Sequence, residues 1–154
     1  MSKKFCNHCG RLYEGTCSCR KEKRNYKHIN FYDSTAWRSL SNFIRTRDYD
    51  LCRLAFYMQK HPYNPETCSG VYKLLYDYLI DAYGQIRRHG GGMNNKLIVH
   101  HIVPREDDYT LQYVAENLIT LDYHTHEFIH QLYNTKHKKE VQQILKDVVA
   151  EEMF

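Results

Sequence analysis

Two adjacent histidines, His100 and His101, end an apolar and largely β-branched run that begins at Leu97. The run predicts a strand, and because successive strand side chains point to opposite faces, the two imidazoles should face different sides. In-line hydrolysis of a phosphodiester needs groups on opposite sides of phosphorus. A base activates water on one side, while a metal ion stabilises the departing oxygen on the other. One histidine is therefore a candidate base and the other a candidate metal ligand.

Further polar side chains with matching chemistry follow downstream. Asn117 precedes a second apolar run, and His126 and His130 come after it, four residues apart. That spacing places both imidazoles on one face of a helix. The chain has ten histidines, so such a pair alone arises easily by chance. Together with the earlier motif, however, the pair allows three histidines and one asparagine to converge on one metal ion and one phosphate.

In order and spacing, these residues resemble the histidine-asparagine-histidine signature of the HNH endonucleases. The resemblance spans roughly residues 31 to 133, and the stretch from Phe31 to Asp48 is similar to the first helix of short phage-encoded members. It implies a ββα-metal (His-Me finger) core, in which a hairpin is followed by a helix. It also implies that His101 is the general base and that Asn117 holds the hairpin so that His101 is correctly aimed. The implied metal ligands are His100, His126 and His130.

The activity implied by the resemblance is metal-dependent cleavage of DNA that leaves 5′-phosphate and 3′-hydroxyl ends. Three neutral imidazoles favour Zn, Ni, Mn or Co over Mg, which prefers oxygen ligands. Phage members of the family often act beside the DNA-packaging terminase, so the resemblance implies packaging proteins as partners and the bacterial cytoplasm as location. Two other classes stay open: a catalytically inactive, zinc-dependent nucleic-acid-binding protein, and a structural or adaptor protein of the packaging machine.

Many phage-type members also carry a structural zinc site made of two cysteine pairs, and here that site is incomplete. Its positions hold Cys52, Ala55, Asp122 and Thr125, a set that does not make a dependable tetrahedral zinc site. We therefore expect neither Asp122 nor Thr125 at zinc-binding distance from Cys52. The helical spacing of apolar residues within about 51–90 predicts two inserted helices that brace the hairpin instead. The alternation of side chains at 51–58 leaves a strand as the alternative there.

A second metal signal lies at the amino end, where four cysteines form a C-x-x-C pair and a C-x-C pair. Two close pairs complete a tetrahedron at Zn–S distances of about 2.3 Å. Disulfides are the alternative, but they need an oxidising compartment, and no apolar segment typical of a secretion signal follows Met1. We predict a structural zinc bound by Cys6, Cys9, Cys17 and Cys19.

Basic side chains mark candidate contacts to the DNA backbone. A run of five cations directly follows the cysteines and would make binding salt-dependent, although such a run alone is more often a solvated linker. A helix at 34–47 is expected to bury a stripe that comprises Trp37, Leu40, Phe43 and Ile44. Arg38, Arg45 and Arg47 lie off this stripe, although exposed arginines on a helix are usually only solubilising. The candidate DNA-binding residues are Arg20, Lys21, Lys23, Arg24, Lys27, Arg38 and Arg45.

Length and composition set the domain organisation. At 154 residues and a formal net charge of +4, the chain can hold one modest core and an appended module. No stretch approaches the ~20 apolar residues of a membrane span. We predict an α+β, mostly helical fold with a zinc module and basic linker at 1–28 and an endonuclease domain at 29–154. Apolar spacing predicts that a docking helix at about 136–152 closes the chain.

Overall fold

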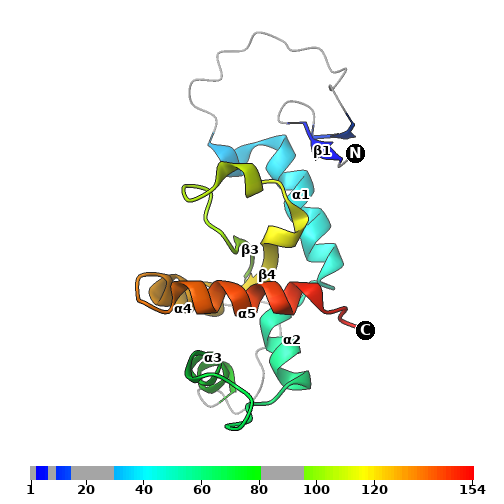
Figure 1. The fold of residues 1–154 in the computed structure, drawn as a ribbon. Coiled ribbons are helices and arrows are strands. Elements are labelled where there is room, and N and C mark those ends of the chain that lie inside the picture. The colour runs from blue at the N-terminus through cyan, green and yellow to red at the C-terminus, as the bar shows by residue number, and fades with distance from the viewer. Residues whose placement is uncertain (1–2, 7–9, 15–29, 81–95) are drawn as a thin grey trace.

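The computed structural model describes residues 3–6, 10–14, 30–80 and 96–154 (Figure 1). At its centre, β3 (Leu97–His101) pairs antiparallel with β4 (Leu118–Asp122), so that Val99 lies opposite Thr120. The helix α4 (Tyr123–Tyr133) follows β4 directly, and α5 (Lys138–Ala150) packs beside it. The described part is mostly helical with two small antiparallel sheets, which confirms the predicted α+β class.

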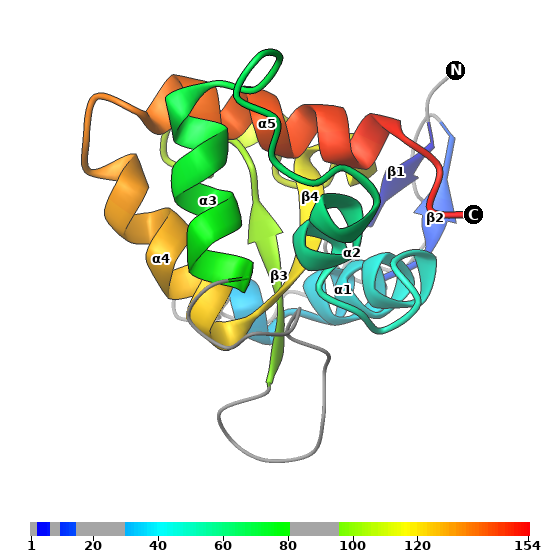
Figure 2. The same cartoon turned by 90° about the horizontal axis from the view of Figure 1, so that it is seen from below.

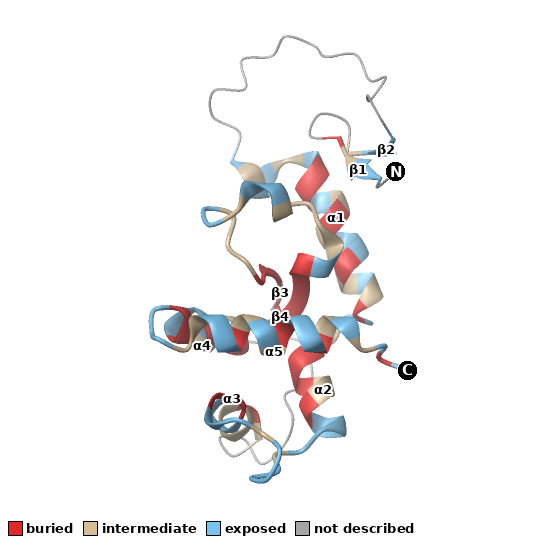
Figure 3. Ribbon diagram, viewed as in Figure 1, coloured by how far each residue is buried: buried red, intermediate tan, exposed pale blue. Residues whose placement is uncertain are grey.

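Helices cover both faces of the β3–β4 hairpin. One face packs on α1 (Thr35–Arg47), and the other packs on α2 (Arg53–Lys60) and α5 (Figure 2). The strand alternation sorts the side chains accordingly: Val99 and Leu118 join the cluster on α1, whereas Ile119 and Leu121 join the larger one. Figure 3 shows buried residues concentrated on β4 and on the facing sides of α1 and α2.

The first helix begins where the sequence predicts it. The Ser34 hydroxyl accepts a hydrogen bond from the Trp37 backbone N–H at 3.2 Å, which caps the helix. Its buried residues are Ala36, Trp37, Leu40 and Ile44. The expectation that Phe43 is buried is wrong, because Phe43 is 53% exposed. At about 100° per residue, Phe43 lies at one edge of the stripe of buried residues and not at its centre, and this edge stays exposed.

The inserted segment is helical as predicted, and the strand alternative at 51–58 is wrong. Leu54, Ala55 and Met58 of α2 are buried in the large apolar cluster, where α2 packs on α5 and β4, and α3 (Gly70–Ile80) contributes to the same cluster. Residues 81–95, which hold the end of the second predicted helix, lie outside the described part. The predicted carboxy-terminal helix appears as α5, with Val141 and Leu145 fully buried. No described helix combines the length and the apolar character that a membrane crossing requires.

A small hairpin near the amino end packs on α1. It pairs β1 (Lys4–Phe5) with β2 (Leu12–Tyr13), and Phe5 contacts the apolar cluster of α1. Gly10 has φ +68°, and a Cβ there would lie 2.9 Å from Thr35 Cγ2, so the turn requires glycine. Cys6 is buried next to this turn. Cys9, Cys17, Cys19, the five cations at 20–27 and the domain boundary at 28 lie outside the described residues.

A buried carboxylate joins four elements behind the hairpin. Asp48 has no exposed surface, and it accepts hydrogen bonds from Arg47 Nε at 2.8 Å and Arg53 Nη1 at 2.6 Å. It also accepts one from the Thr120 N–H at 2.9 Å. Arg53 Nη2 in turn donates to the Val149 carbonyl at 2.9 Å. This network links the end of α1, the start of α2, β4 and the end of α5.

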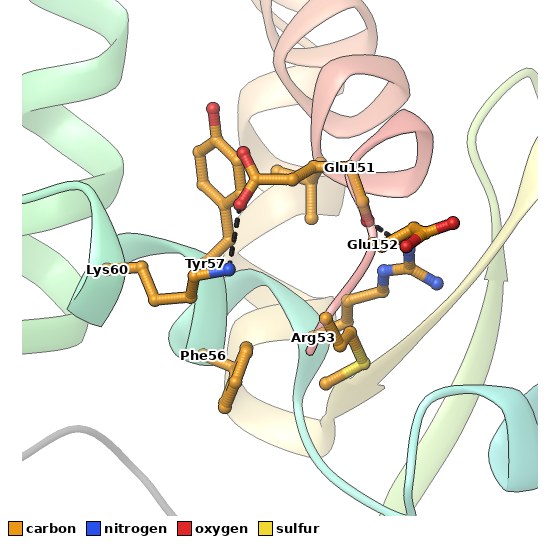
Figure 4. A pocket seen from close by; sticks show the side chains of 8 residues that line it. Arg53, Phe56, Tyr57, Lys60, Glu151 and Glu152 are labelled. Carbon is orange, nitrogen blue, oxygen red and sulfur yellow. Dashed lines mark hydrogen bonds and ion pairs between the residues drawn. The ribbon is translucent and has the colours of Figure 1, made fainter.

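The same region is closed by the segment after α5. A small pocket lies between this segment and α2, with Arg53 at one end and Lys60 at the other (Figure 4). Lys60 Nζ lies 3.0 Å from Glu151 Oε1, and His61 Nε2 lies 2.9 Å from each Glu151 carboxylate oxygen. These hydrogen bonds lower the pKa of Glu151, chiefly the one with His61. They fasten the chain end to α2.

The incomplete cysteine site contains a hydrogen-bonded polar group. Asp122 caps α4 by accepting from the Thr125 N–H at 3.0 Å and the Thr125 hydroxyl at 2.6 Å. Burial, and then the nearby charge of Asp122, raise the pKa of Cys52 to about 12. The Asp122 carboxylate is thus hydrogen-bonded to Cys52, so the expectation that Asp122 lies out of reach of this thiol is wrong. Within the described ranges, however, no third potential ligand completes a metal site with them.

The raised pKa of Cys52 predicts an alkaline loss of stability. An unfolded thiol ionises near pH 8.5, whereas the folded thiol keeps its proton to about pH 12. The unfolded state therefore binds fewer protons above pH 8.5, and the stability falls as the pH rises. We expect the free energy of unfolding of wild type, taken relative to that of Cys52→Ala, to fall by about 2 kcal/mol between pH 8 and pH 10. Urea unfolding of both proteins at the two pH values measures this difference. An unchanged difference would contradict the assignment.

Candidate metal centre

Three histidines from two elements converge at one end of the hairpin. Each of His100, His126 and His130 offers a ring nitrogen, and these nitrogens lie within 4.8 Å of one another. The ring centroid of His100 lies 5.3 Å from that of His126 and 5.2 Å from that of His130. Strand alternation directs His100 toward α4, and the four-residue spacing places the other two on the helix face that meets it.

The surroundings of His100 and His126 favour the neutral imidazole, which is the form that binds metal ions. His100 is 3% exposed, and burial, then the neighbouring His126 and His130, hold its pKa well below the usual range. Burial and then His130 also lower the pKa of His126, against an opposing effect of Glu127. Metal binding needs the neutral ring, and a protonated trio would bring like charges together.

The donor set fits a divalent metal ion. His126 Nε2 and His130 Nε2 lie 2.9 Å apart, so two ring nitrogens already face each other. His126 Nδ1, on the other side of that ring, lies 3.4 Å from Glu127 Oε1, so Nε2 is the nitrogen of His126 that faces the cluster. His130 is exposed, which leaves the centre accessible from one side. Three imidazoles with an open side are typical of sites for zinc and related metals.

His101 lies on the opposite face of β3 from His100. Its ring stacks on Trp37 of α1, with centroids 4.9 Å apart and planes at 20°. The Nε2 atom lies 3.0 Å from the Gln112 carbonyl oxygen. Because a carbonyl only accepts, Nε2 carries the proton and Nδ1 is the basic nitrogen. Burial chiefly lowers the pKa of His101, Arg105 adds to this, and the bond to Gln112 opposes it.

Asn117 holds the loop that follows His101. Its side-chain oxygen accepts from the Val103 N–H at 2.8 Å, and its amide donates to the Val103 carbonyl at 3.1 Å. Its own carbonyl accepts from the Ile102 N–H at 2.8 Å. The side chain therefore binds backbone across the hairpin, as the resemblance implies, and it fixes the residues directly after the paired histidines.

All four histidines line one cleft of about 550 Å³. The same cleft is lined by Arg45, which the sequence singled out, and by Lys96 and Arg105, which it did not. The guanidinium carbon of Arg105 lies 3.6 Å from the centroid of the Phe31 ring, and this contact holds the cation beside His101. In the sequence, the one hint that Arg105 belongs to the cleft is its position four residues after His101, directly behind Pro104. Arg38 is exposed and is not among the described residues that line the cleft.

Sequence reasoning also missed Tyr133, whose ring lies against His100. Tyr133 follows His130 by three residues and His126 by seven, so helical spacing could have placed it on the same face. Burial raises the pKa of its hydroxyl, which therefore stays protonated.

Comparisons with protein-family models, with curated proteins and with solved structures found no match for this chain. The assignment of a function therefore depends on the chemistry and geometry of the cleft.

Proposed function

We propose that this protein is a metal-dependent DNA endonuclease of the HNH type, in which β3, β4 and α4 form the ββα-metal core. One observation carries the proposal: a cluster of three imidazoles and a separate, stacked His101 line the same cleft. A catalytically inactive protein that uses a bound metal ion only to stabilise its fold needs the three ligating histidines, but it does not need a neutral imidazole in the same cleft. Hydrolysis needs both, on opposite sides of the reacting phosphorus.

In the proposed reaction, His101 Nδ1 accepts a proton from water, and the water oxygen attacks phosphorus. The bond from phosphorus to the 3′ oxygen breaks, and this oxygen takes a proton from solvent, which leaves a 5′-phosphate and a 3′-hydroxyl. Asn117 keeps His101 aimed by holding the loop after it. A divalent ion bound by His100, His126 and His130 would neutralise charge on the phosphate and the leaving oxygen. The imidazole donors favour Zn, Ni, Mn or Co over Mg.

The positive lining of the cleft supports a polyanionic substrate. Arg45, Lys96 and Arg105 line the cleft together with one carboxylate, that of Glu106. Cations at such positions bind phosphates with an affinity that falls as the salt concentration rises. DNA is therefore the proposed partner. Packaging proteins of a phage, and the cytoplasm of its bacterial host, remain proposals that depend on the resemblance alone.

The test is incubation of the purified protein with supercoiled plasmid in the presence of Zn²⁺, Ni²⁺, Mn²⁺, Co²⁺ or Mg²⁺. We expect nicked or linear DNA with at least one of these metal ions, and no cleavage product when a chelator is added. His126→Ala should abolish cleavage, whereas His124→Ala on the same helix should not, because His124 is outside the cluster. Binding of DNA without cleavage under any metal would favour the alternative of a catalytically inactive, zinc-dependent nucleic-acid-binding protein.

A separate structural zinc is proposed at the amino end, bound by Cys6, Cys9, Cys17 and Cys19. We expect about one tightly held zinc per chain at this site, since four cysteines complete a tetrahedral site. The double variant Cys6→Ser/Cys9→Ser should lose this zinc in metal analysis and keep the histidine site. Cys68→Ser is the matched control and should keep the zinc. Unchanged tight zinc in the double variant would refute the ligand set.

A further inference from the structure

The hydroxyl of Tyr133, on α4, contacts both His100 and the backbone at the end of β3. It thereby links the strand and the helix that carry the three clustered histidines. It lies 3.3 Å from His100 Nε2 and donates a hydrogen bond to the Ile102 carbonyl at 2.7 Å. Both rings are almost fully buried, with 3% of His100 and 9% of Tyr133 exposed. The contact therefore has little competition from water.

The hydrogen-bond inventory of these groups fixes their roles. A tyrosine hydroxyl has one proton, and the Ile102 carbonyl can only accept it. Toward His100 the hydroxyl must then act as the acceptor. The neutral His100 ring consequently carries its proton on Nε2, and its free lone pair is on Nδ1.

We propose that Tyr133 is a positioning residue that holds His100 in the Nε2-protonated tautomer, so that Nδ1 is the metal-binding atom. The proposal rests on the proposed metal site and deepens it. Neutral histidine ligands commonly donate their second ring N–H to an outer partner, which sets the tautomer and the ring orientation. Here that partner stands on α4, the helix that carries the other two ligands.

The Ile102 bond adds a second constraint. Ile102 directly follows the paired histidines, and its N–H is already bonded to the Asn117 carbonyl. With Tyr133 on its carbonyl, both backbone polar groups of Ile102 are held. The hydroxyl of Tyr133 thus fixes the end of β3 relative to α4, and it aims the His100 ring at the same time.

The test is Tyr133→Phe, which keeps the ring and removes only the hydroxyl. Loss of such outer partners typically weakens metal binding about 10–100-fold. We expect a loss of this size for Zn²⁺, measured in the full chain through the ring resonances of His126 and His130 during titration. Nitrogen-15 spectra of the metal-free wild type should show the His100 proton on Nε2, and this measurement needs no variant.

Tyr72→Phe is the matched control. The Tyr72 hydroxyl also donates to a backbone carbonyl, that of His61, but from α3 and outside the histidine cleft. This variant should lose stability and keep wild-type zinc affinity. Zinc affinity of Tyr133→Phe within twofold of wild type, or a His100 proton on Nδ1, would overturn the role of Tyr133. Zinc binding without DNA cleavage in wild type would instead overturn the endonuclease and leave this inference standing.

Discussion

Replacing His101 by Ala should reduce DNA cleavage about 10²–10⁴-fold, which is the usual contribution of a general base. The ring nitrogen that would accept the proton disappears, while the proposed metal ligands, His100 and the two histidines of α4, lie on the side of β3 away from His101. Affinity for the metal and for DNA should therefore stay near that of wild type. Single-turnover cleavage, metal titration and DNA binding on the same preparation measure the three quantities.

Two results would contradict the assignment of His101 as the general base. Retention of more than a small fraction of the cleavage rate would show that another group activates water. Because His101 also stacks on Trp37, the stability of the variant should be measured alongside. A fall in rate accompanied by an equal loss of metal affinity would indicate a disturbed centre rather than a missing base.

Replacing Asp48 by Ala should cost about 3–5 kcal/mol of folding free energy, the range found when one partner of a buried ion pair is removed. Arg53 is 5% exposed and would be left as a buried cation without its carboxylate. The Thr120 N–H in the middle of β4 would also lose its acceptor. Urea unfolding monitored by circular dichroism measures the change.

Asp107→Ala supplies the matched control. Asp107 pairs with Lys138 at 2.6 Å, but 40% and 34% of the two side chains are exposed. Such a surface pair is worth about 0.2–1 kcal/mol. Equal losses for the two aspartate variants would show that the Asp48 network does not stabilise the fold through its burial.

The sequence alone determined the local features of the site. The alternation of a strand separates His100 from His101, and a four-residue spacing joins His126 to His130, because both periodicities are properties of the backbone. The same reasoning predicted the helices seen as α1 and α5, and it favoured a helix over a strand for the segment that forms α2. Each of these features depends only on residues within a few positions of one another.

Tertiary packing decided the features that join distant segments. Arg53 reaches the Val149 carbonyl 96 residues away, and Tyr133 reaches Ile102 across 31 residues. No period in the sequence encodes such pairs, since they depend on how whole elements pack. The wrong expectation that Phe43 is buried has the same cause. Apolar spacing shows that a helix has an apolar stripe, but it does not show which edge of the stripe packs on the hairpin. For the same reason the sequence did not predict that Lys96 and Arg105 line the cleft. They lie beside the histidines only because α1, β3 and α4 pack together.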